Sequence, residues 1–298
     1  LISISCVVIT SSEDNIHQAI LKNFMNSPKK ELFKVYHSLF EKSYNLNSEE
    51  GIKRYKIFKS NLKKIKEFNS LNLNFNLGLT DFADMTIDEF REKFSGLKLG
   101  ENAGIIKNNA TFNATYDHAI PSDFKSVNWT DYHTAGMSQG NCGSCWAFGT
   151  VGSIEGNYKI KYKKSIELSR QQLVDCSTEN FACDGGTYLA AFNYILENGL
   201  ALDDDYFYTS GIRGAPNPTC RAKTYKRLDI LEDFEYCGGF VKSCSTKEVL
   251  ELLKKGILAS HICAFNTHFA LYTNGYLFDF SPKNPNPTQE QIDAALIE

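Results

Sequence analysis

Residues 139–148 read Gln-Gly-Asn-Cys-Gly-Ser-Cys-Trp-Ala-Phe, and this stretch decides how the rest of the chain is interpreted. Cys142 and Cys145 stand beside small residues, and apolar residues at helical spacing follow from Trp146 onward. A cysteine in the first turn of a helix lies at the positive end of the helix dipole, which lowers the pKa of its thiol and favours the nucleophilic thiolate. The amides of that turn have no helical partner, so they can stabilise an oxyanion together with the side-chain amide of Gln139. One short segment can therefore supply a nucleophile and part of the charge stabilisation that acyl transfer needs.

The spacing of these two cysteines is compatible with three interpretations: a catalytic nucleophile, a redox pair, or a disulfide half beside a buried cysteine. A zinc site would need a second ligand pair at matching spacing, and Cys176 and Cys183 fit poorly because they are seven positions apart. The types of residue around the two cysteines distinguish between these interpretations better than the spacing does. The pentapeptide at 142–146, Cys-Gly-Ser-Cys-Trp, resembles the nucleophile signature of the papain-like cysteine proteases. The resemblance implies that Cys145 is the nucleophile and that its amide and Gln139 hold the oxyanion.

The length and composition are those of an ordinary globular protein with room for two domains: 298 residues, 42% hydrophobic and 22% charged. The net charge of −3 and the lack of a dense basic block argue against a nucleic-acid-binding protein. Nine cysteines favour a secreted or lumenal protein. Glycosylation sequons at Asn109, Asn113 and Asn128 agree with that compartment.

The chain opens with a short apolar run, and we interpret residues 1–12 as the remnant of a signal peptide. The run is too short to span a bilayer, and no other segment is long and apolar enough to do so. The alternative is a buried first strand. An initiator Met and a basic start are absent, so we expect the first residues of the leader to be missing.

Helical periodicity dominates the sequence that follows. One helix is predicted from Ser27-Pro28, with Pro28 at the first helical position, and a longer one from about Glu49 to Asn69. Six residues at intervals of three or four lie along one face of the longer helix: Glu50, Arg54, Phe58, Asn61, Ile65 and Asn69. By itself, the Glu50–Arg54 spacing is typical of a solvated helix pair worth a few tenths of a kcal/mol.

This sixfold pattern resembles the inhibitory propeptide of cathepsin-L-like proteases. Residues 78–84, Gly-Leu-Thr-Asp-Phe-Ala-Asp, resemble the second propeptide motif, Gly-x-Asn-x-Phe-x-Asp, with Thr80 in place of the Asn. The resemblance implies an inhibitory prodomain over 20–95 and, over 96–118, a segment that spans the active-site cleft and contains the cleavage region. A papain-like peptidase domain would then occupy 119–298.

Within that domain, the resemblance assigns substrate contacts to a short loop. The Cys-x-Gly-Gly stretch ending at Gly185 and Gly186 is expected to offer main-chain hydrogen bonds to the substrate, and Tyr188 to line the main specificity pocket. Ala182 departs from the Gly that the family usually has there.

The resemblance also implies a pattern of disulfides. It joins Cys142 to Cys183 and Cys176 to Cys220, and it leaves Cys145 outside them. The remaining cysteines are less constrained: the sequence allows a small loop closed by Cys237 and Cys244, and a buried thiol at Cys263.

The predicted fold is α+β: a papain-like pair of domains, one helical and one a partial β-barrel, preceded by the helical inhibitory prodomain. Capping boxes at Ser169 and Ser245 predict two further short helices. Strands are predicted at 257–262, 269–272 and 275–278, an order that resembles the first strands of the family's barrel.

The catalytic base is the part that the sequence lacks. A His oriented by an Asn is expected about 130–150 residues after the nucleophile, and no His occurs at that distance. His261 and His268 come too early, and no Asn-Ser-Trp follows them. We therefore expect the base and its Asn to lie beyond Glu298, which makes the peptidase domain incomplete at its C-terminus.

The sequence thus predicts a cysteine endopeptidase precursor that acts on protein or peptide substrates and has its own propeptide as intramolecular inhibitor. We expect a monomer of the secretory pathway, lysosomal or vacuolar or secreted, with no cofactor, metal, nucleic acid or membrane partner. Two alternatives stay open. The missing His favours a non-catalytic papain-fold protein that binds peptides or inhibits proteases, and the pair Cys142 and Cys145 allows a disulfide oxidoreductase.

Overall fold

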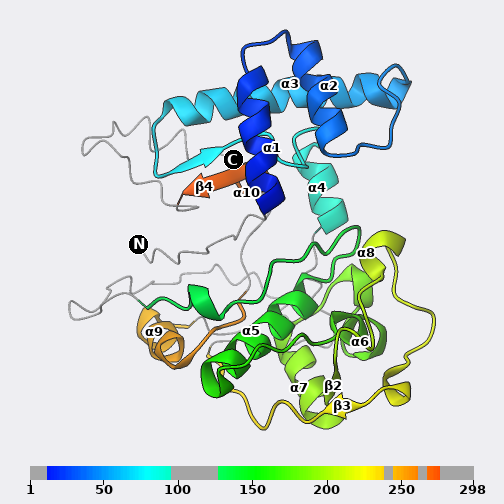
Figure 1. Ribbon diagram of the computed structural model, residues 1–298, viewed down its shortest axis with the longest axis vertical. Coiled ribbons are helices and arrows are strands. Elements are labelled where there is room, and N and C mark those ends of the chain that lie inside the picture. Colours follow the sequence, from blue (N-terminus) through cyan, green and yellow to red (C-terminus); the bar gives the residue numbers. More distant parts are fainter. Residues whose placement is uncertain (1–11, 95–126, 238–243, 261–266, 276–298) are drawn as a thin grey trace, which may run out of the picture. The chain divides into compact units, whose positions relative to one another are not determined.

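The computed structural model describes residues 12–94, 127–237, 244–260 and 267–275 (Figure 1). The chain divides into two compact units. The N-terminal unit contains residues 3–92 and 263–298, and the central unit contains residues 1–2 and 93–262. None of the helices within these described ranges is long and apolar enough to cross a bilayer.

Several predicted features lie outside the described residues and stay predictions. They are residues 1–11 of the signal-peptide remnant, the segment at 96–118 with Asn109 and Asn113, His261, Cys263, and the last predicted strand beyond Gly275.

The N-terminal unit is mainly helical. Its elements are α1 (Ser12–Phe24), α2 (Lys29–Leu39), α3 (Glu49–Ser70), β1 (Phe75–Leu77), α4 (Ile87–Phe94, which runs past the boundary of the unit), α10 (Thr267–Ala270) and β4 (Tyr272–Gly275). The two predicted helices are confirmed as α2 and α3, although Pro28 is the N-cap of α2 and not its first residue. Ser48 begins α3 by accepting a hydrogen bond from the amide of Gly51 at 3.1 Å.

Aromatic side chains from α2 and α3 form the centre of this unit. Phe58 of α3 is fully buried, and its ring centroid lies 5.0 Å from that of Phe33 and 4.9 Å from that of Tyr36. Leu62 and Ile65 continue the same buried face. Burying one such side chain is worth about 1.5–3 kcal/mol, so this face of α3 contributes to the stability of the unit.

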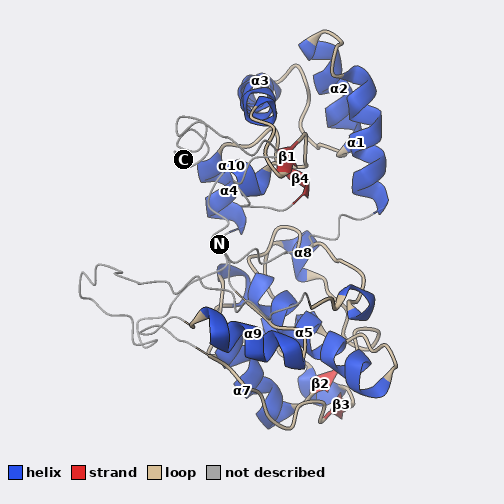
Figure 2. Cartoon of the chain, turned by 90° about the vertical axis from the view of Figure 1, so that its left-hand side faces the viewer, coloured by secondary structure: helices blue, strands red, loops and turns tan. Residues whose placement is uncertain are grey.

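A segment from the far end of the chain completes the N-terminal unit. Strand β4 pairs with β1 in an antiparallel ladder, with Phe75 opposite Gly275 (Figure 2). The prediction of a strand at 269–272 is wrong: residues 267–270 form the helical turn α10, and the strand begins only at Tyr272. The helical turn puts His268 and Leu271, three positions apart, into the same core, whereas strand spacing would separate them.

The central unit has one long helix and several short elements. They are η1 (Thr130–Tyr132), α5 (Cys145–Tyr162), α6 (Arg170–Cys176), η2 (Ala182–Asp184), α7 (Tyr188–Asn198), β2 (Leu200–Ala201), α8 (Ser210–Arg213), η3 (Ala222–Thr224), β3 (Arg227–Leu228) and α9 (Thr246–Lys255). Helix α5 is buried along most of its length and packs against α6 and α7. Trp146 and Val151 are fully buried in the core of the unit. Strands β2 and β3 form a short antiparallel pair.

The two predicted capping boxes differ. Ser245 and Glu248 exchange both hydrogen bonds at the start of α9, which confirms that prediction. Ser169 caps α6 by accepting from the amide of Gln172 at 3.0 Å, but its own amide donates to Ala201. The reciprocal half of that box is therefore absent. The first predicted strand of the barrel is not formed over 257–260, the part of it that the structure describes.

Candidate active site

Cys145 is the first residue of α5, as the sequence predicts, and it is partly buried. It lies outside the three disulfides that the described cysteines form. The turn before it is fixed twice to the loop around Cys183, because Cys142 is bonded to Cys183 and the amide of Gly143 donates to the Cys183 carbonyl at 2.8 Å. The amide of Ser144 donates back to the carbonyl of Cys142 at 2.8 Å. A thiol is thus held at a helix N-terminus, where the dipole favours its thiolate.

The disulfides bear on the alternative chemistry. Cys142 pairs with Cys183 and Cys176 with Cys220, which are the pairs that the family resemblance implies, and Cys237 pairs with Cys244. A dithiol oxidoreductase needs Cys142 and Cys145 to pair with each other. Because Cys142 is bonded to Cys183, it does not form the Cys142–Cys145 pair that the redox interpretation requires.

Gln139 is held close to the nucleophile turn. Its Nε2 donates to the carbonyl oxygen of Cys142 at 2.9 Å. A side-chain amide nitrogen carries two hydrogens, so one remains for a substrate oxyanion. Gly140 follows with φ of 59°, and a Cβ there would lie 2.6 Å from the carbonyl oxygen of Gly211. Only glycine fits this approach of the two backbones.

The loop of Gly185 and Gly186 lies against the start of α5. A Cβ on Gly186 would lie 2.4 Å from Asn180 Oδ1 and 2.8 Å from Trp146 Cδ2, so the absence of a side chain lets the loop pack here. The indole Nε1 of Trp146 donates to the carbonyl of Ala182 at 3.1 Å. Ala182 itself has φ of 51°, a left-handed conformation that glycine adopts more easily.

Tyr188, the first residue of α7, lies over α5. A Cβ on Gly149 would lie 2.7 Å from the Tyr188 ring, and Gly149 is one helical turn after Cys145 on the same face. The Tyr188 hydroxyl donates to the carbonyl oxygen of Ser260 at 2.8 Å. The ring therefore bridges from the nucleophile helix to the segment after α9.

A buried ion pair joins α5 to α6, and the sequence gives no signal for it. Arg170 Nη2 donates to Glu155 Oε2 at 2.8 Å, with both side chains almost fully buried. Glu155 also accepts from the amide of Leu168 at 2.8 Å and from Thr134 Oγ1 at 2.7 Å. Burial raises the pKa of nearby Asp203, an effect that the charge of Arg170 opposes.

In the N-terminal unit, Arg54 is the centre of a charged cluster. Its Nε donates to Glu50 at 2.5 Å, and its Nη1 donates to Glu89 Oε2 at 2.8 Å and to the carbonyl of Asp84 at 3.1 Å. The Glu50–Arg54 pair is therefore more than a solvated helix pair, because Arg54 joins α3 to α4 and to the loop between them. Lys53 adds a second cation on Glu89 at 2.6 Å.

Two side-chain amides on α3 bind the chain between α3 and α4. Asn61 Nδ2 donates to the carbonyls of Ala83 and Met85 at 3.0 and 2.9 Å, and Asn69 exchanges two hydrogen bonds with Leu77. Thr80, which replaces the motif Asn, still makes a hydrogen bond, from Oγ1 to the carbonyl of Ala270 at 2.7 Å.

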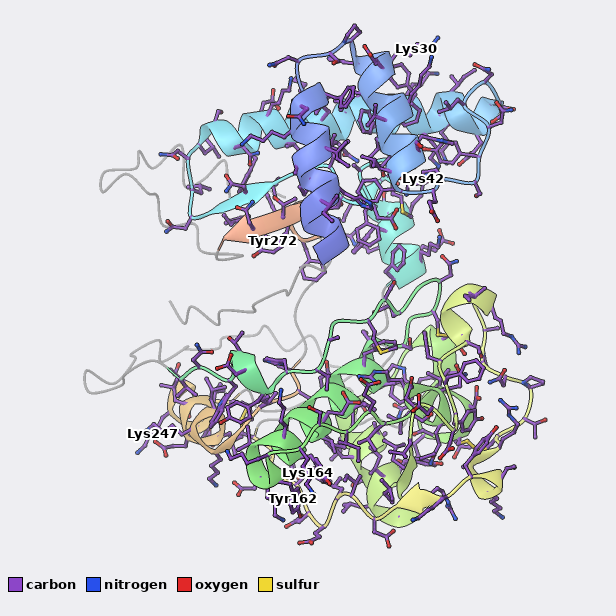
Figure 3. All side chains as sticks on the ribbon, in the orientation of Figure 1. Lys30, Lys42, Tyr162, Lys164, Lys247 and Tyr272 are labelled. Atoms are coloured by element: carbon purple, nitrogen blue, oxygen red, sulfur yellow. A yellow bond between two sulfur atoms is a disulfide. The ribbon has the colours of Figure 1, made fainter. Side chains whose placement is uncertain are left out.

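Asp84, the last residue of this motif, is buried and surrounded by donors. Tyr36 and Tyr44 donate to its two carboxylate oxygens at 3.1 and 2.7 Å, and Lys42, labelled in Figure 3, lies 3.4 Å from Oδ1. Burial and the neighbouring carboxylate of Asp84 raise the pKa of Tyr36 well above its ordinary value. Tyr36 therefore stays a donor.

His268, one of the two histidines that the sequence places too early, belongs to the N-terminal unit. It is buried in α10, with its ring 4.8 Å from that of Phe68. Its position is explained by packing in this core.

Two families of known domains match the sequence. One, described as papain family cysteine protease, matches residues 123–291, and the other, described as cathepsin propeptide inhibitor domain (I29), matches residues 33–90. The chain belongs to the papain family of cysteine proteases. It has the α+β papain fold together with the propeptide of this family.

Named relatives and solved structures agree with this membership. Cysteine proteinase RD21A of Arabidopsis thaliana is 33% identical over 84% of this chain and 53% of its own length. Stem bromelain precursor is similar in structure, with a TM-score of 0.54, 29% identity, and coverage of 67% of this chain and 62% of that one. Digestive procathepsin L 3 of Tenebrio molitor has a TM-score of 0.51, 28% identity, and coverage of 68% and 64%. The chain spans about half the length of the Arabidopsis relative.

Proposed function

We propose that this chain is the precursor of a cysteine endopeptidase, with Cys145 as its nucleophile and its own propeptide as its inhibitor. The observation that supports this most is the position of Cys145 at the N-terminus of α5, outside the disulfides that tie down the turn beside it. We assign 1–12 to a leader remnant, 20–95 to the prodomain, 96–118 to the cleft-spanning and cleavage region, and 119–298 to the peptidase domain.

The chemistry follows from the groups at this turn. The Cys145 thiolate attacks the carbonyl carbon of a peptide bond, and the resulting oxyanion accepts hydrogen bonds from the Cys145 amide and from the second Nε2 hydrogen of Gln139. The C–N bond then breaks, a base protonates the leaving amine, and a thioester remains. Water hydrolyses the thioester and regenerates the thiol. The base is a His that we expect outside the described residues.

Substrate contacts are proposed for the loop before α7. Because Gly186 has no side chain, the backbone of this loop packs closely against Asn180 and Trp146. The main-chain groups of Gly185 and Gly186 would then form hydrogen bonds with an extended peptide substrate. The Tyr188 ring lies against Gly149, which is one helical turn after Cys145 on α5, so this ring is suited to form a wall of the adjacent side-chain pocket. We further propose a monomer of the secretory pathway that is delivered to a lysosome or vacuole or is secreted.

Labelling of the thiol by a peptidyl epoxide tests the nucleophile directly. We expect the processed wild-type protein to be labelled at Cys145 much faster than the same protein in urea, because the folded site activates the thiol. A Cys145→Ala variant is the matched control and is expected to take up no label. If the folded protein reacts no faster than the unfolded one, the thiol is not activated, and the non-catalytic papain-fold interpretation is preferred.

A further inference from the structure

The hydroxyl of Tyr208 contacts both residues that flank the nucleophile turn. It donates to the backbone carbonyl of Gln139 at 2.9 Å, and it lies 2.7 Å from the hydroxyl of Ser144, the residue directly before Cys145. We propose that Tyr208 is a positioning residue for the oxyanion site, because it fixes Gln139 relative to the start of α5. The inference rests on the proposed function.

The direction of the two hydrogen bonds follows from the single phenolic hydrogen. Tyr208 uses that hydrogen on the carbonyl of Gln139, so the Ser144 hydroxyl must donate to the phenolic oxygen. The other acceptor near Ser144, the carbonyl of Cys142, is 3.4 Å away and competes weakly. Burial raises the pKa of the Tyr208 hydroxyl, while donation from Ser144 opposes the rise. The phenol therefore remains protonated at physiological pH and keeps both contacts.

The Tyr208 ring is itself held in place. It meets the ring of Phe148 edge to face, with centroids 4.9 Å apart. The guanidinium of buried Arg170 lies 5.6 Å from the centroid of the Phe148 ring. Three residues on, the carbonyl of Gly211 accepts from the amide of Asn141 at 2.8 Å. The segment that contains Tyr208 thus lies along the nucleophile turn, and packing of the ring holds the hydroxyl in position.

In this arrangement the position of the oxyanion donor Gln139 and the reactivity of the Cys145 thiol depend on different groups. Gln139 is fixed at its side chain by Cys142 and at its backbone by Tyr208, so the loss of the phenolic hydroxyl releases one of two restraints on an oxyanion donor. Thiolate formation at Cys145 depends on the helix dipole and on a base, neither of which Tyr208 supplies. Amide hydrolysis passes through an oxyanion, whereas alkylation by iodoacetamide displaces iodide at carbon and does not.

The test compares Tyr208→Phe with Tyr206→Phe in the processed enzyme. Tyr206 is the matched control because its hydroxyl also has two partners, Asp175 at 2.6 Å and the amide of Arg221 at 3.2 Å, and neither belongs to the nucleophile turn. For Tyr208→Phe we expect kcat per titrated active site to fall about tenfold with KM within about twofold, since small misplacements of catalytic groups lower rates strongly. The iodoacetamide alkylation rate of Cys145 should stay within about twofold. Tyr206→Phe should leave all three quantities close to wild type.

Three outcomes overturn the inference. If Tyr208→Phe hydrolyses substrate at the wild-type rate, the hydroxyl does not position the site. If hydrolysis and alkylation fall together, or if Tyr206→Phe gives the same loss of kcat, the effect is general destabilisation. A processed wild-type protein that alkylates at Cys145 but cleaves no peptide contradicts the proposed function itself, and that result is distinct from an active wild type with an equally active variant.

Discussion

Replacement of Glu89 by Gln tests how the charged cluster of the propeptide responds to acid. Glu89 of α4 accepts from Lys53 at 2.6 Å, from Arg54 at 2.8 Å and from the amide of Thr86 at 3.0 Å. Partial burial alone would raise the pKa of this carboxyl, but the hydrogen bonds from Lys53 and Thr86 and the charge of Arg54 lower it from 4.5 to about 2. Glu89→Gln keeps the shape and removes the charge.

The sign and size of the effect follow from that lowered pKa. A carboxyl with a lower pKa in the folded state stabilises that state above its unfolded pKa, and the contribution is lost as pH falls from about 4.5 towards 2. Lowering the pKa of this carboxyl from 4.5 to about 2 corresponds to an upper limit of about 3–4 kcal/mol. Solvent screening reduces this, since the side chain is 24% exposed, and we expect about 1–2 kcal/mol. Acidification from pH 7 to 5 therefore leaves this anchor in place.

Hydrogen exchange measures the effect within the N-terminal unit. In a Cys145→Ala background, which prevents self-cleavage, peptides from α3 and α4 should exchange faster in Glu89→Gln than in wild type at pH 7 and pH 5, after correction for the intrinsic rates. The difference should shrink at pH 3. Glu67→Gln is the control, because Glu67 on α3 is exposed and its ion pair with Lys63 is long, at 3.5 Å. A difference that vanishes by pH 5, or that grows below it, would refute the lowered pKa.

Three further predictions concern other parts of the molecule. Phe58→Ala should lower the free energy of unfolding of the N-terminal unit by about 3–5 kcal/mol in urea titrations, since the residue is fully buried; a loss below about 1 kcal/mol would contradict the packing described. The double change Cys142→Ser/Cys183→Ser should cost the central unit up to about 4 kcal/mol and slow epoxide labelling; unchanged labelling would mean that the bridge does not order the turn. Asn128 is exposed and its Oδ1 accepts from the amide of Thr130 at 2.9 Å, so we expect an N-glycan there. Peptide mapping after glycosidase treatment should find it lost in Thr130→Ala and retained in Thr130→Ser; an unmodified Asn128 in otherwise glycosylated protein would exclude it.

Features set by neighbours in sequence could be predicted. Helix α3 follows from the spacing of Phe58, Asn61 and Ile65, because a helix brings residues three and four apart onto one face. The start of α9 follows from Ser245 and Glu248, whose reciprocal hydrogen bonds span only three residues. The position of Cys145 at the first residue of α5 was likewise visible in the change from small residues to an apolar helical run.

Features set by distant partners could not be predicted. The residues around Phe269 read as a strand, yet Leu271 packs in a core formed by residues about 200 positions earlier, and a helical turn satisfies that core better. The partner of Arg54 on α4, Glu89, lies 35 residues away. Tyr208 gave no signal, because its contacts with Ser144 and Gln139 span 64 and 69 residues.

The sequence by itself determined the family of this protein and helices such as α3 and α9, and it predicts Cys145 as the nucleophile, because each depends on residue types close together in the chain. Only the tertiary structure decided what holds Gln139 beside Cys142, which groups share the charge of Glu89, and where the segment of β4 packs. The physical reason is that hydrogen bonds and buried contacts act over a few ångströms in space. Their partners are brought within that range only by the folded chain.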